Sequence, residues 1–385
     1  MKEYQRVIRE APGSFFLFGP RGTGKSSWIR LAFPDAYVIN LLDEKLFQSY
    51  LVDIGLFAQT LRALPQGSTV VVDEVQRLPS LLNEVHRFIE ERSFRFILSG
   101  SSARKLKQQG TNLLAGRALR RDLFPFLPQE LGADFDLDRV LAYGSIPVIW
   151  SQNSNPEALE VYVQTYLKQE IQAEAQIRNL PSFARFLNIA ALFHGQVLNA
   201  SSLARDAGVQ RTTVASYLDV LEDTLMIFRL PGYKANIRVK ERSHPKLYWF
   251  DAGVVRAIKN QLHPLSIEEK GALFEGFIAG VLRAYKSYHR LFDDWAYWSA
   301  QQHEIDFLIF RGDSCVAIEV KASARFRDDY CSGLEAFSLS KPSARCRRRI
   351  VVYLGHQRLK TSTGVEILPL ADFLSELESA TIFPA

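Results

Sequence analysis

Cysteine is scarce in this chain of 385 residues, and the three cysteines, Cys315, Cys331 and Cys346, stand far apart in sequence. They match neither the paired spacing of a zinc site nor the framework of a disulfide-rich secreted domain. Long apolar runs are also missing, and the amino terminus MKEYQRVIRE lacks the apolar core of a signal peptide. These absences predict a cytoplasmic protein that does not associate with membranes.

A strong excess of one charge is missing too. The formal net charge of +5 is modest for this length and does not by itself indicate a nucleic-acid partner. With 47% hydrophobic and 23% charged residues, the composition is that of a globular protein. The chain is too long for one ordinary domain and is expected to hold about two to four units.

The clearest motif is GPRGTGKS at 19–26, between the apolar run Phe15 to Phe18 and a helix-like segment. Its glycines let successive backbone N–H groups face a polyphosphate, and the following helix points its positive end at the same anion. Lys25 is expected to reach the outer phosphates of ATP, and the Ser26 hydroxyl to ligate Mg²⁺. The predicted nucleotide contacts are Gly19, Pro20, Arg21, Gly22, Thr23, Gly24, Lys25, Ser26 and Ser27.

Two carboxylates follow the next buried strand. The run Thr69 to Val72 is continuously apolar, which is typical of a parallel strand covered on both faces, and Asp73 and Glu74 come directly after it. Ligands bind at the carboxyl ends of such strands. Asp73 is expected to hold Mg²⁺ through water, and Glu74 to orient or deprotonate the attacking water. The alternative is an ordinary helix start with favourable dipole charges.

Hydroxyl groups and an arginine complete the predicted nucleotide site. The strand Phe94 to Leu98 ends in the cluster SGSS, where a hydroxyl is expected to contact the terminal phosphate or the water. The pattern does not say which serine does so, and Ser101 is the candidate. Arg117 is predicted to stabilise the transferred phosphoryl group, within its own chain or from a neighbouring subunit of a homo-oligomer. The alternatives for Arg117 are a solvated strand or a DNA contact.

A family resemblance rests on five stretches in this order: GPRGTGKS, VVVDEVQ, ILSGSSARKL, LLAGRALRRDLFPF and LAYGSIPVIW. They resemble the AAA-type ATPases of bacteria and archaea that carry a carboxyl-terminal domain of unassigned function. The resemblance implies ATP binding and hydrolysis, together with a DNA-related role.

The middle of the chain has the spacing of a helix-turn-helix. Leu203 and Ala207 supply the inner face of one helix, Gly208 the turn, and Val214 and Leu218 the inner face of a second helix. Polar side chains near the start of the second helix suit phosphates and base edges. The DNA contacts predicted there are Arg211, Thr212 and Thr213.

A basic stretch follows the predicted second helix. Met226 to Leu230 is expected to form a wing strand, and five basic residues between positions 229 and 242 stand against one glutamate. This composition favours a surface that follows the phosphates of double-stranded or branched DNA, through Lys234, Arg238 and Lys240. Winged helices also serve as packing or protein-contact modules, so that alternative stays open.

A hairpin near the carboxyl terminus carries the second constellation. Two β-rich runs flank the pair 312–313, Gly-Asp, which favours a tight turn. Counting back from the turn places Asp306 opposite Glu319 and Glu304 opposite Lys321, all on one face. Opposed carboxylates destabilise a sheet unless something neutralises them.

This hairpin resembles the core of the PD-(D/E)xK nucleases. The resemblance implies that Asp306 and Glu319 ligate Mg²⁺ and that Lys321 positions or activates the water that attacks a phosphodiester. Glu275, on an upstream and largely apolar helix, is a candidate third ligand. Ile305 departs from the motif, which has proline there. Members of this superfamily also bind DNA without cleaving it.

The predicted fold class is α/β, with a parallel-sheet P-loop ATPase domain, a helical winged-helix middle domain and an α/β nuclease-like carboxyl-terminal domain. The predicted boundaries are 1–126 for the AAA-type ATPase domain, 127–180 for a helical lid or connector, 181–245 for the winged helix-turn-helix and 246–385 for the nuclease-like domain.

Two functional hypotheses follow. The first is an ATP-hydrolysing enzyme that binds DNA and cleaves or processes it with Mg²⁺, branched and junction DNA included. The second is an ATP-switched DNA-binding or regulatory protein whose nuclease fold is catalytically silent. A small-molecule kinase is weaker, because a kinase has no need of the middle and carboxyl-terminal modules.

Overall fold

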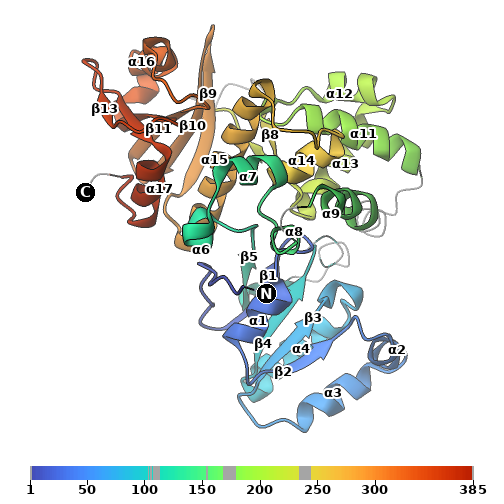
Figure 1. Cartoon of the computed structure of the whole chain (residues 1–385). Coiled ribbons are helices and arrows are strands. Elements are labelled where there is room, and N and C mark those ends of the chain that lie inside the picture. Colours follow the sequence, from blue (N-terminus) through green and yellow to red (C-terminus); the bar gives the residue numbers. More distant parts are fainter. Residues whose placement is uncertain are drawn as a thin grey trace.

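The computed structural model describes residues 2–102, 104, 106, 113–152, 155–167, 179–233 and 244–383. The amino-terminal part of the chain forms one lobe, and the rest packs together as a larger lobe (Figure 1). Within these described ranges, no helix has both the length and the apolar character needed to cross a membrane.

A five-stranded sheet with the order β2-β3-β4-β1-β5 forms the centre of the amino-terminal lobe. All neighbouring strands are parallel, and apolar side chains are buried on both faces of the sheet. The prediction of a parallel α/β sheet from continuous apolar runs is therefore confirmed. The strands are β1 (Ser14–Phe18), β2 (Tyr37–Asn40), β3 (Thr69–Asp73), β4 (Arg95–Gly100) and β5 (Ala118–Asp122).

Helices cover both faces of this sheet. Between residues 44 and 64 the chain forms two helices, which are separated at Asp53, the residue that caps the second one. The helices of the lobe are α1 (Lys25–Ala32), α2 (Glu44–Val52), α3 (Ile54–Arg62) and α4 (Leu81–Arg92).

A connector of short helices leads from β5 into the larger lobe. Its last described element is a short π-helix, Tyr162–Leu167, and residues 168–178 of the predicted helical lid or connector lie outside the described residues. The connector helices are α6 (Pro128–Leu131), α7 (Leu137–Tyr143), α8 (Pro147–Trp150) and α9 (Pro156–Val161).

The middle of the chain combines helices with a small antiparallel sheet of order β6-β8-β7. The two helices predicted around Gly208 are present, and Gly208 ends the first of them with a φ of 67°. The elements are α11 (Leu180–Leu192), β6 (Gln196–Val197), α12 (Ala200–Ala207), α13 (Arg211–Asp223), β7 (Ile227–Leu230), β8 (Lys246–Trp249) and α14 (Ala252–Ile258).

A mixed six-stranded sheet of order β13-β14-β12-β11-β10-β9 forms the carboxyl-terminal part. The strands are β9 (Asp294–Ala300), β10 (His303–Arg311), β11 (Ser314–Lys321), β12 (Cys346–Tyr353), β13 (Leu359–Lys360) and β14 (Glu366–Pro369). The predicted hairpin is β10 and β11, which pair antiparallel with Arg311 opposite Ser314. The accompanying helices are α15 (Ile267–His289), α16 (Ser332–Ser338) and α17 (Leu370–Glu378).

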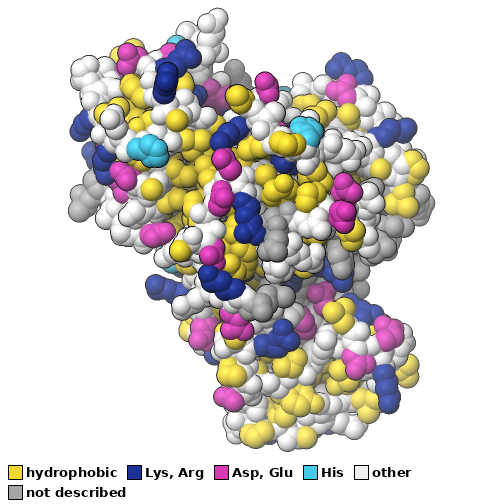
Figure 2. Space-filling view, viewed as in Figure 1, with side chains coloured by type: hydrophobic (Ala, Val, Ile, Leu, Met, Phe, Trp, Pro, Cys, Tyr) yellow, Lys and Arg dark blue, Asp and Glu magenta, His cyan; other side chains and the backbone are white. Residues whose placement is uncertain are grey.

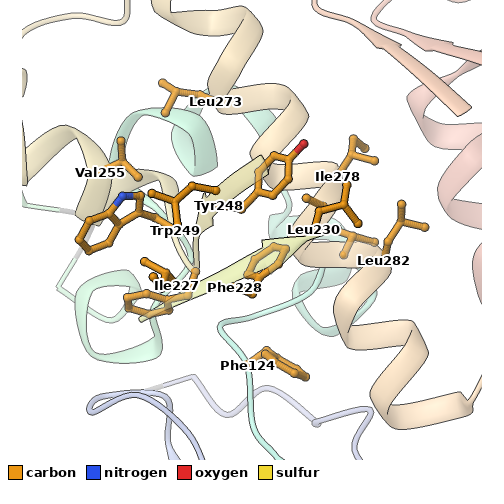
Figure 3. Packing of buried hydrophobic residues seen from close by; sticks show 14 of the residues in the cluster. Phe124, Ile227, Phe228, Leu230, Tyr248, Trp249, Val255, Leu273, Ile278 and Leu282 are labelled. Carbon is orange, nitrogen blue, oxygen red and sulfur yellow. The ribbon is translucent and has the colours of Figure 1, made fainter. Parts of the chain in front are cut away.

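One continuous apolar cluster joins the connector, the middle and the carboxyl-terminal part. Figure 3 shows Leu230 of the small sheet beside Ile278 and Leu282 of α15, and Trp249 of the same sheet beside Val255 of α14. The predicted boundary between residues 245 and 246 is wrong for this reason. It would separate β8 from β6 and β7, with which β8 pairs. The larger lobe is a single packed body.

Asp251 is a buried carboxyl group in this body, where it accepts hydrogen bonds from the Ser145 N–H at 2.8 Å and the Val254 N–H at 3.2 Å. Complete burial raises its pKa from 3.8 to about 6, although these backbone N–H groups oppose the rise. The folded state therefore binds a proton more tightly than the unfolded state does. The stability that this proton contributes is full at low pH and is lost as the pH rises from about 4 to about 6.

We expect Asp251→Asn, which cannot ionise, to remove this contribution. Measured by chemical denaturation, the unfolding free energy of wild type relative to the variant should fall between pH 4 and pH 7, by about 1.4 kcal/mol for each pKa unit of the shift. A difference that stays constant over this range would contradict the prediction.

Candidate nucleotide site and carboxylate centre

The phosphate loop lies between the end of β1 and the start of α1. Gly22 and Gly24 have φ values of 80° and 88°, a left-handed conformation that glycine adopts without steric cost. Gly24 precedes the first turn of α1, so the free N–H groups of that turn face the concave side of the loop. The buried Lys25 ammonium donates to the carbonyls of Gly19 at 2.7 Å and Pro20 at 3.2 Å. The cation thus lies against the loop that is expected to hold the phosphates.

A hydroxyl and a carboxylate meet beside this loop. Ser26 Oγ donates to Asp73 Oδ2 at 2.9 Å, and Ser99 Oγ donates to the other oxygen of Asp73. These are oxygen donors of the kind that Mg²⁺ prefers, and they stand next to the predicted phosphate positions. The residues therefore fit a magnesium nucleotide. Of the other predicted contacts, Thr23 donates within the loop to Pro20 at 2.8 Å, while Arg21 and Ser27 are exposed.

Glu74 is positioned by a residue that the sequence analysis missed. Gln76 Nε2 donates to Glu74 Oε2 at 2.5 Å and to Ser101 Oγ at 3.1 Å, so one buried amide links both candidates. The amide needs the glycine at position 100, where an added Cβ would lie 2.2 Å from Gln76 Oε1. The available signal was the sequence Asp-Glu-Val-Gln, in which a polar residue stands in the turn three residues after the end of β3.

Three successive carbonyls of the phosphate loop accept hydrogen bonds from outside the sheet. The Tyr162 hydroxyl donates to Arg21 O at 2.8 Å, the Val148 N–H to Gly22 O at 3.3 Å and Arg6 Nη1 to Thr23 O at 2.8 Å. Tyr162 and Val148 belong to the connector, and Arg6 is paired with Glu130 of the connector at 3.0 Å. The loop is thereby attached directly to the larger lobe.

Arg117 lies at the other edge of the sheet. Its neighbour Ala118 stands beside Ser14 at the start of β1, whereas the phosphate loop follows Phe18, about 13 Å away along the strand. The Arg117 guanidinium pairs with Glu90 on α4. This position lies away from the phosphate loop of its own chain, and the predicted role of Arg117, in its own chain or a neighbouring one, stays a prediction.

The predicted DNA contacts are partly described. Arg211 and Thr212 are exposed at the start of α13, and Thr213 is half-buried. Lys234, Arg238 and Lys240 lie outside the described residues. Arg229, which was counted among the phosphate-tracking residues, pairs with Asp219 at 3.1 Å and with Glu222, both on α13. On the face seen in Figure 2, basic and acidic side chains are interspersed rather than gathered in one patch.

The hairpin brings together the nuclease-like residues Asp306, Glu319 and Lys321. With Glu275 and Glu304 they form a cluster that we call the carboxylate centre. Phe307 stands opposite Ile318, which agrees with the predicted register of Asp306 and Glu319. Both carboxylates are buried, and the Val320 N–H donates to Asp306 Oδ2 at 2.9 Å. Lys321 pairs with Glu319 at 2.5 Å.

The sequence analysis missed a second lysine at this centre. Lys246 of β8 contacts Glu275 at 2.9 Å, Glu304 at 2.6 Å and Asp306 at 3.2 Å. Glu304, which was predicted opposite Lys321, is one of these partners. The available signal was a lysine within the apolar run KLYWF. Across the described ranges, no group of three or more histidine, cysteine, aspartate or glutamate side chains is arranged to hold a metal ion.

Burial and mutual repulsion control ionisation at this centre. Burial, followed by the charge of Asp306, raises the pKa of Glu275 to about 7 and that of Glu319 to about 8. Burial works against the charge of Lys246, but the carboxylates of Asp306, Glu275 and Glu304 raise its pKa above the ordinary value. Lys246 therefore remains an ammonium ion at neutral pH and neutralises Asp306 and Glu275, while Lys321 pairs with Glu319.

The position of Gln76 generates a test of the nucleotide site. We expect Gln76→Leu to slow ATP hydrolysis about 10- to 100-fold, because Glu74 and Ser101 lose the group that orients them. ATP affinity should be nearly unchanged, since the hydrogen bonds of Gln76 within the described part of the chain go to Glu74 and Ser101 and not to the phosphate loop. Single-turnover hydrolysis and equilibrium ATP binding measure the two effects separately. A parallel loss of binding and hydrolysis would contradict the assigned role.

Comparison with known families divides the chain into three successive matches. Residues 12–132 match the family described as AAA domain. Residues 134–265 and 270–373 match two families that are each described as a domain of unknown function, DUF8612 and DUF4143.

Two relatives resemble most of the chain. An uncharacterised protein of Mycobacterium tuberculosis is 28% identical over 388 residues, which cover 96% of this chain and 83% of the relative. An uncharacterised protein of Methanocaldococcus jannaschii is 23% identical over 337 residues, which cover 79% and 73% of the two chains.

Solved structures share only limited overall similarity. The ORC1 protein of Aeropyrum pernix, in complex with DNA, aligns at a TM-score of 0.30 with 14% identity over 66% of this chain and 87% of its own. DnaA bound to AMPPCP and single-stranded DNA aligns at 0.27 with 15% identity over 55% and 82%. Scores this low carry no conclusion about the whole chain. The family match, the phosphate loop and the parallel sheet agree with one another, and over residues 12–132 this chain is similar to AAA-type P-loop ATPases.

Proposed function

We propose that the protein binds and hydrolyses ATP with Mg²⁺ and that its nucleotide state controls binding of DNA by the larger lobe. The observation that carries this proposal is the convergence of Lys25, Ser26, Asp73 and Glu74 at the carboxyl edge of one parallel sheet. A polyphosphate with its cation is the ligand that this combination of groups suits.

Each group of the loop has a defined task in this proposal. The Lys25 ammonium and the N–H groups of the loop bind the phosphates, and Ser26 and Asp73 hold Mg²⁺, which neutralises charge on the phosphoryl group. Glu74, held by Gln76, orients the attacking water or accepts its proton. Ser101 shares the same amide, so it stands where a change at the terminal phosphate would be sensed.

A chain of contacts supports control of the larger lobe by the nucleotide. Directly after Ser101, the Ser102 hydroxyl accepts from the N–H of Arg104 at 3.0 Å, and Arg104 pairs with Asp223 at the end of α13 at 3.2 Å. Leu225, two residues farther on, packs in the apolar cluster of the ATPase lobe. The helix whose first turn carries Arg211 is therefore attached at its other end to the segment that follows β4, in which Ser101 lies.

The proposed DNA surface comprises the start of α13 and the basic segment that follows β7. Arg211 and Thr212 are exposed, as a contact to phosphates or base edges requires. Lys234, Arg238 and Lys240 are proposed to follow the backbone of double-stranded or branched DNA. Since Arg117 lies far from the loop of its own chain, we also propose a homo-oligomer in which it serves a neighbouring site.

The contacts of Lys246 favour the hypothesis in which the nuclease-like fold has no catalytic activity over the hypothesis of a Mg²⁺-dependent nuclease. An ammonium group already neutralises Asp306 and Glu275, two of the three residues predicted to ligate Mg²⁺ for cleavage. We therefore propose DNA binding without cleavage. Glu319 and Lys321, paired with each other, have a structural part in this proposal.

We expect the affinity for duplex DNA to differ at least about fivefold between the states with a non-hydrolysable ATP analogue and with ADP. Fluorescence anisotropy with labelled linear and branched DNA measures this difference, and gels of the same mixtures with Mg²⁺ should show no cleavage products. Lys25→Ala should abolish the difference. Equal affinities in the two states, or cleavage that Asp306→Ala removes, would contradict the proposal.

Arg211→Ala is expected to weaken DNA binding. The slope of the logarithm of the binding constant against the logarithm of the salt concentration should become smaller by about one. Arg205→Ala is the matched control, because Arg205 is a highly exposed arginine on the neighbouring helix α12. The same anisotropy titration at several salt concentrations checks both variants. Equal losses for the two variants would assign binding to general charge and not to the start of α13.

Breaking the pair between Arg104 and Asp223 should uncouple the two lobes. We expect Arg104→Ala to hydrolyse ATP at nearly the wild-type rate but to lose the difference in DNA affinity between the two nucleotide states. The exchanged pair Arg104→Asp with Asp223→Arg should restore part of it. Arg87→Ala, which breaks a pair with Glu84 within α4, serves as the control. Coupling that survives in Arg104→Ala would rule out this route.

A further inference from the structure

Lys246 is a buried lysine of the small antiparallel sheet whose side chain pairs with carboxylates of the carboxyl-terminal part. It begins β8, pairs in the small sheet with Val197 and Leu230, and is 2% exposed. Its ammonium reaches carboxylates of α15 and β10, which belong to the carboxyl-terminal part. Burying such a charge is costly unless several partners compensate for it.

Three carboxylate oxygens converge on this ammonium. The distances from Lys246 Nζ are 2.6 Å to Glu304 Oε1, 2.9 Å to Glu275 Oε1 and 3.2 Å to Asp306 Oδ1. Carboxylate oxygens from two elements around one point are the ligand set that a hard divalent cation uses. Such a cation would have to share this point with a positive charge, which Coulomb repulsion opposes.

The carboxylates of this centre have at least one buried oxygen that accepts no hydrogen bond in the described structure. Glu319 is more than nine-tenths buried, and its Oε2 is a buried oxygen without a hydrogen-bond partner in the described structure. The centre also has more carboxylates than cations, since four carboxylates face two lysines. These groups are Glu275, Glu304, Asp306 and Glu319 on one side and Lys246 and Lys321 on the other.

The remaining contacts hold the oxygens in place. The Tyr248 hydroxyl donates to Glu275 Oε1 at 2.6 Å, and the Val320 N–H donates to Asp306 Oδ2 at 2.9 Å. Tyr248 comes from the same strand as Lys246, and its ring is fixed in the apolar cluster with the hydroxyl at one margin (Figure 3). The carboxylates are therefore preorganised by groups other than Lys246.

We propose that the Lys246 ammonium takes the place of a divalent cation among Glu275, Glu304 and Asp306, beside the unpartnered oxygen of Glu319. The folded chain consequently excludes metal from this centre, and removal of the ammonium converts the centre into a site for one divalent cation. The masked metal site is a property of the carboxyl-terminal part and does not depend on ATP or DNA.

The test is titration of Mn²⁺ into the full chain without nucleotide, followed by calorimetry and by the electron paramagnetic resonance signal of free Mn²⁺. Lys246→Met, similar in length but uncharged, should bind one additional Mn²⁺ per chain at least about tenfold more tightly than any site of the wild type. Its melting temperature should rise with Mn²⁺. The second variant, Lys246→Met with Asp306→Asn, should lose both effects, which separates this centre from the phosphate loop.

Lys270→Met is the matched control. It also removes one lysine that pairs with a carboxylate, Asp138 at 2.7 Å, but the pair lies away from the centre. The proposal is overturned if the wild type binds Mn²⁺ as tightly as Lys246→Met does. It is also overturned if Lys246→Met folds but binds no additional Mn²⁺. If Lys246→Met does not fold without metal, Mn²⁺ must restore its melting transition, and a variant that stays unfolded with Mn²⁺ also overturns it.

Discussion

A lysine buried among carboxylates connects the parts of the larger lobe. Lys246 belongs to the small antiparallel sheet, while its partners Glu275 and Asp306 stand on α15 and β10. Because both the ammonium and the carboxylates are withdrawn from water, neither side is stable in this position without the other. The aromatic residues that follow on the same strand, Tyr248 and Trp249, extend the joint into the apolar cluster. The strand thus ties the middle of the chain to the carboxyl-terminal sheet by charge and by packing.

The phosphate loop is attached to this body as well as to its own sheet. Successive carbonyls of the loop accept hydrogen bonds from Tyr162, Val148 and Arg6, all outside the sheet. A loop that rearranges around a polyphosphate must alter these bonds, and the connector that supplies two of them leads into α11. The pair between Arg104 and Asp223 adds a second contact between the two lobes, close in sequence to Ser101.

Much of the geometry of the candidate nucleotide site could be predicted from the sequence, because its signals are local. The glycines of the loop, Lys25 and Ser26 are contiguous, and Asp73 with Glu74 ends a run of apolar residues whose burial on both faces identifies a parallel strand. The register of Asp306 against Glu319 was also readable, since a two-residue turn determines it. Each of these inferences needed only the chain within a few residues of the motif.

Tertiary structure alone decided the contacts between distant segments. The pairing of Lys246 with carboxylates near residues 275 and 306 depends on which strand neighbours β7, and a strand's own residues do not specify its neighbours. For the same reason the sequence analysis placed a domain boundary at residue 245, between strands that pair. It also left open whether Arg117 faces the phosphate loop of its own chain. By itself the sequence determined the local geometry of the phosphate loop and the hairpin. Only the packed fold determined which cation neutralises the hairpin's carboxylates, because burial and charge compensation are properties of segments brought together in space.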